Sequence, residues 1–290
     1  MRVHIIVNKY AGKGNGEQMM DEIKTMLTGV NISSSFTERT PDALIKYIKE
    51  NQDITHLIAI GGDGTMNQCA QALAWSNIIL IPVPAGTGTD FVRTVGKLSP
   101  EIIMDVIKND NFRYCDLGKI TSDIFSGFFI NVMEAGMGGA VMKRVNSTGA
   151  RSGLTISSSI LKEVLRGNKY RLIMKSEERD YSGNIMDVVI ANGQYYGKGI
   201  HISPESILDD GFLDVHIIKY MPRLKTLSKL RTLKNGTYIR DENVVNLKIR
   251  EVSIDSDGPV EIDGESFGPG KMKIRVCHNA LKIFSQDFKP

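Results

Sequence analysis

The stretch that decides the fold reads Thr55-His56-Leu57-Ile58-Ala59-Ile60-Gly61-Gly62-Asp63-Gly64-Thr65. Its apolar part predicts a buried strand over 56–60, its glycines predict a tight turn, and a helical pattern follows over 65–75. The amides of such a turn, at the positive end of a helix dipole, suit phosphate oxygens, and the Asp63 carboxylate could hold Mg²⁺ beside them. A purely structural role is the less favoured alternative for an isolated turn of this composition.

The residues on either side of this stretch repeat the same alternation. Apolar runs predict strands over 3–7, 33–36 and 78–83, and helical patterns predict helices over 16–27 and 42–51. Strands that alternate with helices form a parallel sheet covered on both faces, and such sheets bind ligands at the carboxyl ends of their strands. The sequence therefore predicts an N-terminal doubly wound α/β domain with a ligand site at that edge.

Two further loops are predicted at the same edge. The first follows the strand over 3–7, runs from Asn8 to Gly16 and contains glycines and lysines. The second follows the strand over 78–83 and offers the hydroxyls of Thr87 and Thr89. Both loops suit phosphate or ribose, and Asn8 is the favoured position because it ends a strand. Taken alone, each loop is also compatible with an ordinary surface turn.

The pattern changes near residues 112–122. Beyond this point, short apolar runs separated by Gly, Asn, Asp and Pro predict a mainly β domain, a sandwich with helical insertions over 155–165 and 221–233. We therefore expect two domains, over 1–118 and 119–290, that pack directly and form a cleft. The C-terminal segment is expected to pack back on the first domain.

Two acidic turns mark the second half of the chain. Residues 206–214 carry three carboxylates around a glycine, and their oxygens suit Mg²⁺ or Ca²⁺, although an ordinary hairpin turn fits this segment equally well. The other turn is Asp263-Gly264-Glu265. An aspartate before glycine usually forms a turn; if it faces the phosphate-binding loops, Asp263 could accept the proton of an attacking hydroxyl.

Composition excludes several classes of protein. The net charge is only +3, with a pI near 8.6, so no nucleic-acid partner is expected. The three cysteines, Cys69, Cys115 and Cys277, form neither a zinc motif nor a disulfide framework, which indicates a reducing compartment. No segment reads as a signal peptide or a membrane span. We expect a cytoplasmic protein.

One basic segment leaves two interpretations open. Residues 215–240 contain seven Lys or Arg and no acid, and Leu224, Leu227, Leu230 and Leu233 recur at three-residue spacing. A basic amphipathic helix of this kind can lie on the anionic inner face of a membrane. Alternatively, its leucines pack on the sandwich and its lysines face water.

The motifs over 61–68, 84–91, 204–214 and 263–265, taken in this order and spacing, resemble the diacylglycerol kinase catalytic family of bacterial-type soluble lipid kinases. The resemblance extends nearly from end to end of the chain. A GGDGT turn is shared with NAD kinases and, more loosely, with phosphofructokinases. The resemblance to the lipid kinase branch in particular rests on two other motifs. They are the segment Asp209-Asp210-Gly211-Phe212-Leu213-Asp214 and the Asp-Gly-Glu turn.

This resemblance implies ATP- and Mg²⁺-dependent transfer of the γ-phosphate to a lipid hydroxyl, with Asp263 as the general base and transient contact with a membrane. It also implies a Mg²⁺ site away from the phosphates, formed by Asp210 and the carbonyls of Ile207 and Phe212. The residues implied to bind the nucleotide are Asn8, Thr37, Gly61, Gly62, Asp63, Gly64, Thr65, Met66, Asn67, Gln68, Thr87 and Glu265.

Three positions depart from the family pattern. Gln68 stands where a glutamate is usual, Thr89 where an asparagine is usual, and Lys9 where a proline often follows Asn8. The site therefore has one carboxylate fewer near the phosphates and a hydroxyl in place of an amide, so metal-mediated contacts are expected to be weaker or bridged by water.

Two other functions are compatible with the sequence. The first is NAD kinase-like phosphorylation of a soluble hydroxyl compound, which ranks lower because the two acidic turns resemble the lipid branch. The second is a non-catalytic nucleotide or lipid sensor, suggested by Gln68 and Thr89 but opposed by the intact Asp63 and Asp263. The sequence leaves open the identity of the lipid and the oligomeric state, with a homodimer as one option.

Overall fold

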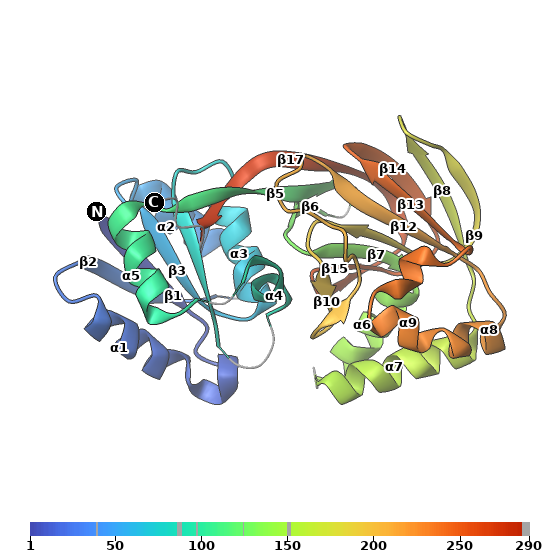
Figure 1. Cartoon of the computed structure of the whole chain (residues 1–290), viewed down its shortest axis with the longest axis horizontal. Helices are drawn as coiled ribbons and strands as arrows, with labels where there is room; N and C mark the ends of the chain where they lie inside the picture. Colours follow the sequence, from blue (N-terminus) through green and yellow to red (C-terminus); the bar gives the residue numbers. More distant parts are fainter. Residues whose placement is uncertain (39, 86–88, 97, 124, 150–151, 286–290) are drawn as a thin grey trace. The chain divides into compact units, whose positions relative to one another are not determined.

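The computed structural model describes residues 1–285 except 39, 86–88, 97, 124 and 150–151 (Figure 1). The chain divides into two compact units: Met1–Leu117 with His278–Pro290, and Gly118–Cys277. Two long strands, β5 (Phe112–Thr121) and β17 (Gly270–Phe284), run from one unit into the other.

The first unit is built on a parallel sheet with the strand order β4-β3-β1-β2. Its strands are β1 (Arg2–Val7), β2 (Asn31–Phe36), β3 (His56–Gly61) and β4 (Ile79–Pro84). Val7 lies opposite both Phe36 and Ile60, so the carboxyl ends of these strands are level with one another. The end of β17 adds a further parallel strand beside β4, where Lys282 pairs with Ile79.

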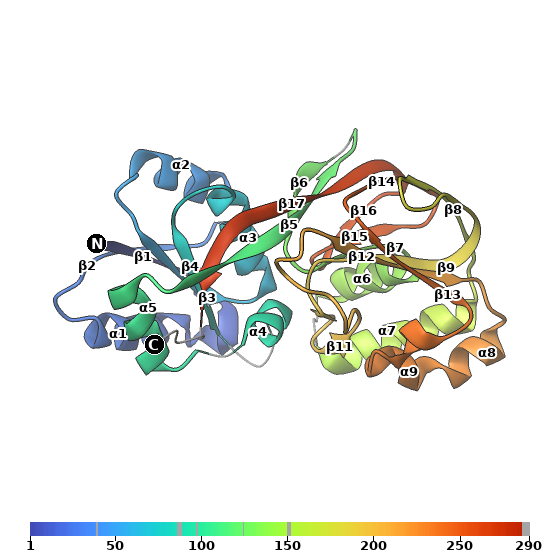
Figure 2. The same ribbon diagram turned by 45° about the horizontal axis from the view of Figure 1, so that its top comes forward.

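Helices cover both faces of this sheet, as predicted. In Figure 2, α1 and α5 lie on one face and α2 and α3 on the other. The helices are α1 (Gly16–Met26), α2 (Asp42–Glu50), α3 (Asp63–Leu73), α4 (Asp90–Val95) and α5 (Pro100–Asn109), with a short 3₁₀ helix over Ala11–Gly14. All six residues of β3 are buried, which is expected of a central strand with helices on both sides.

The second unit is an antiparallel sandwich. Its strands are β6 (Ser126–Phe129), β7 (Val132–Gly136), β8 (Tyr170–Ser176), β9 (Tyr181–Ala191), β10 (Tyr195–Tyr196), β11 (Ile200–His201), β12 (Leu213–Lys219), β13 (Val244–Ile249), β14 (Glu251–Ser256), β15 (Val260–Ile262) and β16 (Glu265–Phe267). Alternate residues of β7 face two different cores, because side chains along a strand point to opposite faces. Met133 and Ala135 join a core made by strands alone, and Val132 joins a core shared with helices. The predicted α/β plus β-sandwich class is confirmed.

The helices of the second unit are α6 (Met137–Thr148), α7 (Gly153–Arg166), α8 (Arg223–Ser228) and α9 (Leu230–Lys234), with a 3₁₀ helix over Thr237–Arg240. The single helix predicted over 221–233 is wrong, because the structure ends α8 at Ser228 and starts α9 at Leu230. Leu224 and Leu227 are exposed, whereas Leu230 and Leu233 pack against the helix-side core. Within the described ranges, none of the helices combines the length and apolarity needed to cross a membrane.

Helix α6 was not predicted, because glycines in its first turn hide the helical pattern. The packing explains these glycines. A Cβ on Gly139 would come within 2.0 Å of the Pro259 carbonyl oxygen, so the helix can approach the neighbouring backbone only without a side chain there. Gly153 at the start of α7 differs, since no described residue lies within 4 Å of the position that its Cβ would take.

These two glycines provide a matched pair of substitutions. Gly139→Ala should lower the free energy of unfolding by about 2 kcal/mol through overpacking against backbone, and Tm by roughly 4–8 °C. Gly153→Ala should leave Tm unchanged or raise it slightly, because alanine favours helix. Thermal unfolding followed by circular dichroism measures both. Equal Tm values for the two variants would show that the close approach of α6 to Pro259 is not a real constraint.

Candidate active site

The strand ends of the first unit meet at one edge of the parallel sheet. The Asn8 N–H donates to the Ile60 carbonyl oxygen at 2.9 Å, and the Thr37 N–H donates to the Val7 carbonyl oxygen at 2.9 Å. The Ala85 N–H donates to the Gly61 carbonyl oxygen at 3.1 Å. These bonds continue the sheet ladder beyond its strands, so Asn8, Thr37 and the glycine turn lie at the same edge.

The Gly61–Gly64 turn leads directly into helix α3. Gly62 precedes the helix in an extended conformation, and no side chain caps the helix start. Among the residues that the structure describes, a Cβ on Gly62 or Gly64 would meet nothing within 4 Å, which leaves space in front of the first turn on this side. Because the first N–H groups of a helix have no partner within the helix, this turn is suited to phosphate oxygens. The residues present therefore fit a nucleotide triphosphate chain.

The second predicted loop contributes to the same place. The Phe91 N–H at the start of α4 donates to Asp63 Oδ1 at 3.2 Å, which joins the two loops. The Thr89 side chain is buried, and its hydroxyl has no hydrogen-bond partner among the residues that the structure describes. Thr87, which was assigned to nucleotide binding, lies outside the described residues.

The residues that follow Asp63 differ in how far they are buried. Thr65 and Met66 are buried in the first unit, so Met66 can offer a nucleotide only its backbone. Asn67 is half-buried and accepts from the Gln71 side chain at 3.1 Å. Gln68 donates from Nε2 to the Glu38 carbonyl oxygen at 2.9 Å, a contact that a glutamate at this position could not make. Gln68 thus ties the start of α3 to the loop that carries Thr37.

In the second unit, a turn presents the carboxylate of Asp263. Asp263 Oδ2 accepts from the Ile130 N–H at 2.8 Å, and Oδ1 accepts from the N–H groups of Asn131 at 2.9 Å and Val132 at 3.1 Å. The Asp263 N–H in turn donates to the Val132 carbonyl oxygen at 3.0 Å. The backbone of Asp263 has φ 45°, in the left-handed region that aspartate tolerates better than most residues. Glu265 follows on β16 with an exposed side chain.

Sequence reasoning missed the segment that holds this aspartate. The carbonyl oxygen of Ile130 accepts from the Asn192 side chain at 2.9 Å, and the carbonyl oxygen of Asn131 accepts from the backbone N–H groups of Asn192 and Gly193, each at 2.8 Å. The segment 130–132 is therefore fixed from two sides. The signal in the sequence was an asparagine directly after the apolar run 128–130, and a second asparagine before Gly193.

Family models match nearly the whole chain. A model described as the diacylglycerol kinase catalytic domain matches residues 2–120. A model described as the YegS C-terminal NAD kinase beta sandwich-like domain matches residues 131–285. The chain belongs to the diacylglycerol kinase family. Since the members of this family are kinases, the chain is a kinase-type phosphotransferase.

Curated relatives agree with this membership. A diacylglycerol kinase of Mycobacterium tuberculosis is 27% identical over 237 residues, which cover 78% of this chain and 75% of that protein. A probable lipid kinase YegS-like of Pseudomonas fluorescens is 28% identical over 255 residues, covering 81% and 79%.

Two solved structures share the fold of this diacylglycerol kinase family member. The crystal structure of a diacylglycerol kinase from Bacillus anthracis superposes with a TM-score of 0.76 at 22% identity, covering 99% of this chain and 97% of that one. An NAD kinase from Archaeoglobus fulgidus in complex with ATP has a TM-score of 0.56 at 11% identity, covering 99% and 94%.

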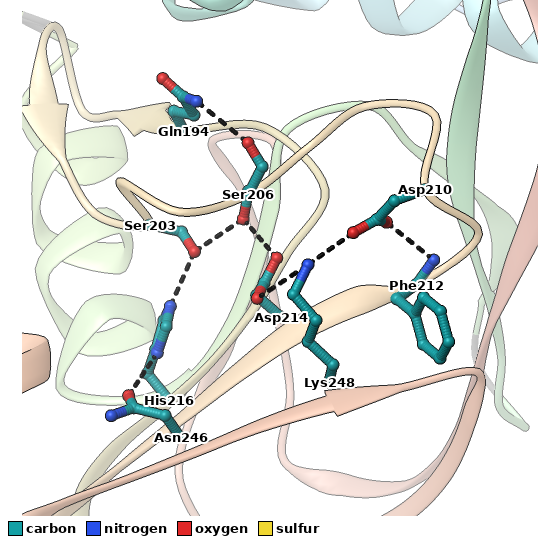
Figure 3. Close-up of polar contacts among 9 residues, drawn as sticks. All are labelled: Gln194, Ser203, Ser206, Asp210, Phe212, Asp214, His216, Asn246 and Lys248. Carbon is teal, nitrogen blue, oxygen red and sulfur yellow. Dashed lines mark hydrogen bonds and ion pairs between the residues drawn. The ribbon is translucent and has the colours of Figure 1, made fainter.

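The segment that the resemblance implies as a Mg²⁺ site has other partners in this kinase (Figure 3). Asp210 Oδ1 accepts from the Phe212 N–H at 3.0 Å, and Oδ2 forms an ion pair with Lys248. The Ile207 side chain is exposed. With the Lys248 ammonium on Asp210, these residues do not fit a divalent cation.

Three buried carboxyl groups lie beneath the Asp263 turn. Glu261 on β15 is directly opposite Glu134 on β7, and Asp187 on β9 is opposite Gly136. The Gly264 N–H donates to Glu261 at 2.7 Å, so Glu261 closes the turn that carries Asp263. Burial, followed by the negative charges of the other two groups, raises the pKa of Glu134 well above its usual range. Burial likewise raises the pKa of Glu261 well above its usual range and that of Asp187 to about 7.

These shifts predict how stability depends on pH. Because the folded protein holds protons that the unfolded chain releases, stability should fall as pH rises from about 4 to about 7, the interval between the ordinary pKa of Asp187, 3.8, and its folded value. Asp187→Asn should therefore raise Tm above that of wild type at about pH 8 and not at about pH 4. Thermal unfolding across this range is the measurement.

The matched control is Asp209→Asn, which changes an exposed carboxyl group of the same unit. It should give the same difference from wild type at both pH values. If Asp187→Asn also shows no dependence on pH, the buried carboxyl groups are not protonated as described.

Proposed function

We propose that this kinase transfers the γ-phosphate of ATP to the hydroxyl group of a lipid of the diacylglycerol class, with Asp263 as the general base. The observation that carries the proposal is the Asp263 carboxylate, which three backbone N–H groups hold at the end of a turn. The family membership and the names of the curated relatives support a lipid as the acceptor.

The nucleotide is assigned to the edge of the first unit. The open space before α3 and the amides of its first turn suit the triphosphate, with Asn8 and Thr37 on either side. Mg²⁺ bound with ATP would neutralise the charge that develops on the transferred phosphoryl group. We assign to Asp63 the role of holding this ion, because its carboxylate belongs to the first turn of α3.

The geometry of Asp263 suits a carboxylate that positions the acceptor. Its two oxygens accept three backbone N–H groups, which fix the plane and position of the carboxylate. Phosphoryl transfer passes through a loose transition state, so catalysis depends on position more than on a strong base. Asp263 therefore orients the hydroxyl oxygen and takes its proton as the new bond forms.

The proposed base is tested by replacing Asp263 with asparagine. Asp263→Asn should lower kcat by at least about 100-fold and leave the KM for ATP unchanged, because a general base acts on the acceptor. The measurement is transfer of label from γ-labelled ATP with Mg²⁺ to a panel of detergent-dispersed lipids that includes diacylglycerol, with NAD and no-acceptor arms.

The control is Asp257→Asn, which changes another aspartate that accepts a backbone N–H, from Arg171 at 2.7 Å. It should keep wild-type turnover. Full turnover in Asp263→Asn would refute the assigned base, and label entering only NAD would replace the lipid acceptor with a soluble one. ATP binding without transfer to any acceptor would favour a sensor.

The second unit also carries a surface suited to a membrane. Leu154, Leu161 and Leu165 follow one face of α7 and are 86%, 42% and 54% exposed. Leu224 on the adjoining α8 is 83% exposed. Exposed basic residues also occur on α7, α8 and α9, three helices that are drawn beside one another in Figure 1. They are Lys162, Arg166, Arg223, Lys225, Arg231 and Lys234.

We include this docking surface, defined by Leu154, Leu161, Leu165 and Leu224, in the proposed function. Helices that expose leucines together with Lys and Arg can bind anionic lipid surfaces through both apolar burial and charge. A kinase that takes its acceptor from a bilayer needs such a reversible contact.

The docking surface is tested on α7. The triple variant Leu154→Glu, Leu161→Glu and Leu165→Glu should bind phosphatidylglycerol vesicles at least tenfold more weakly than wild type, since each buried leucine contributes about 1.5–3 kcal/mol. Its turnover of a short-chain acceptor dispersed in detergent should not change. Vesicle sedimentation and the two activity assays are the measurements.

The control is the triple variant Leu154→Gln, Leu161→Gln and Leu165→Gln, which removes the leucines without adding negative charge. Weaker vesicle binding by this variant as well would show that the lost apolar contact matters. Wild-type binding by the glutamate variant would show that α7 does not contact the membrane.

A further inference from the structure

A chain of polar contacts fastens the segment 203–214 to the strands beneath it (Figure 3). His216 on β12 contacts Asn246 Oδ1 through Nδ1 at 2.8 Å and the Ser203 hydroxyl through Nε2 at 2.7 Å. The Ser206 hydroxyl lies 2.7 Å from the Ser203 hydroxyl and 2.9 Å from Asp214 Oδ2. Ser203, Ser206 and His216 are all buried, so these contacts are shielded from water.

Lys248 connects this chain to Asp210. It lies directly opposite Asp214 in the antiparallel pair of β12 and β13, where cross-strand neighbours of opposite charge attract each other. Its ammonium forms an ion pair with Asp210 Oδ2 and lies 3.8 Å from Asp214 Oδ1. The side chain of Asp214 is only 9% exposed, and that of Asp210 is 22% exposed. One cation therefore neutralises two carboxylates that are partly removed from water.

A divalent cation at Asp210 would conflict with this arrangement. The oxygen Oδ1 already accepts the Phe212 N–H, and Oδ2 already pairs with Lys248. A bound dication would have to share this carboxylate with an ammonium group, whose charge repels it. Its affinity would therefore be reduced by the energy needed to move Lys248 away.

We propose that the ammonium of Lys248 takes the place of a structural Mg²⁺ in this chain, so that the segment 203–214 is held by a covalently attached cation and needs no metal. The segment then keeps its conformation whatever the supply of divalent cations, and the metal requirement of the protein is confined to the Mg²⁺ that accompanies the nucleotide. This inference is independent of the proposed acceptor, because it concerns the nucleotide-free protein.

The test is Mn²⁺ binding to the nucleotide-free full chain, followed by the electron paramagnetic resonance signal of free Mn²⁺, together with Tm measured in EDTA and in Mg²⁺. Wild type should bind no Mn²⁺ that depends on Asp210, and its Tm should be the same in EDTA and Mg²⁺. Lys248→Ala should lower Tm by roughly 2–4 °C in EDTA. It should also gain one Mn²⁺ site, and Mg²⁺ should restore part of the lost Tm.

Three variants complete the design. Lys248→Arg keeps a cation at this position and should behave as wild type. The double variant Lys248→Ala with Asp210→Asn should lose the gained Mn²⁺ site. Lys273→Ala is the matched control, because Lys273 forms an exposed ion pair with Glu251 on neighbouring strands of the same unit. It should change neither Tm nor Mn²⁺ binding.

Two results would overturn the inference. The first is Mn²⁺ binding by wild type that Asp210→Asn abolishes, since the segment would then hold a metal despite Lys248. The second is a Lys248→Ala protein with the Tm of wild type in EDTA, since the ammonium would then contribute nothing. The wild-type measurement decides the matter by itself if Lys248→Ala does not fold.

Discussion

The carboxylate of Asp263 is the constraint on which the second unit depends. It accepts three backbone N–H groups from residues 130–132, and this requires β7 to begin beside the turn. The turn is held from below by Glu261 and from the side by Asn146 of α6, which donates to the Gly264 carbonyl oxygen at 3.2 Å. The glycine-rich start of α6 allows that helix to pack closely enough for this contact. A carboxylate fixed in this way loses little entropy when it acts.

In the first unit, the features that suit a phosphate chain belong to the backbone. A triphosphate is negatively charged and needs hydrogen-bond donors. The first turn of α3 suits it, because its N–H groups have no partner within the helix and the described residues leave space before them. The parallel register and backbone hydrogen bonds bring Asn8 and Thr37 to the same edge. In the proposed function, the first unit supplies donors for the phosphate and the second unit supplies a carboxylate for the acceptor. The Lys248 ion pairs stabilise the segment 203–214 independently of both.

The sequence predicted the elements whose periodicity is undisturbed by packing. These elements are helices α1, α2 and α7 and the strands of the parallel sheet. They were found because the spacing of their apolar residues reflects which of those residues are buried. Helix α6 was missed because close backbone approach put glycines where helix formers are expected. The break between α8 and α9 was missed because the leucine spacing continues across it. The partner of Asp210 could not be foreseen, since Lys248 lies 38 residues away and meets it only through the register of β12 and β13.

The central claim is that ATP binds at the edge of the first unit while Asp263 serves the acceptor in the second. Backbone hydrogen exchange, with and without saturating adenylyl imidodiphosphate and Mg²⁺, tests it most directly because it locates the nucleotide without turnover. The account predicts slower exchange over 61–66 and around Thr37, the residues assigned to the triphosphate, and unchanged exchange over 203–214. Protection confined to the second unit, with none in the Gly61–Gly64 turn, would contradict it.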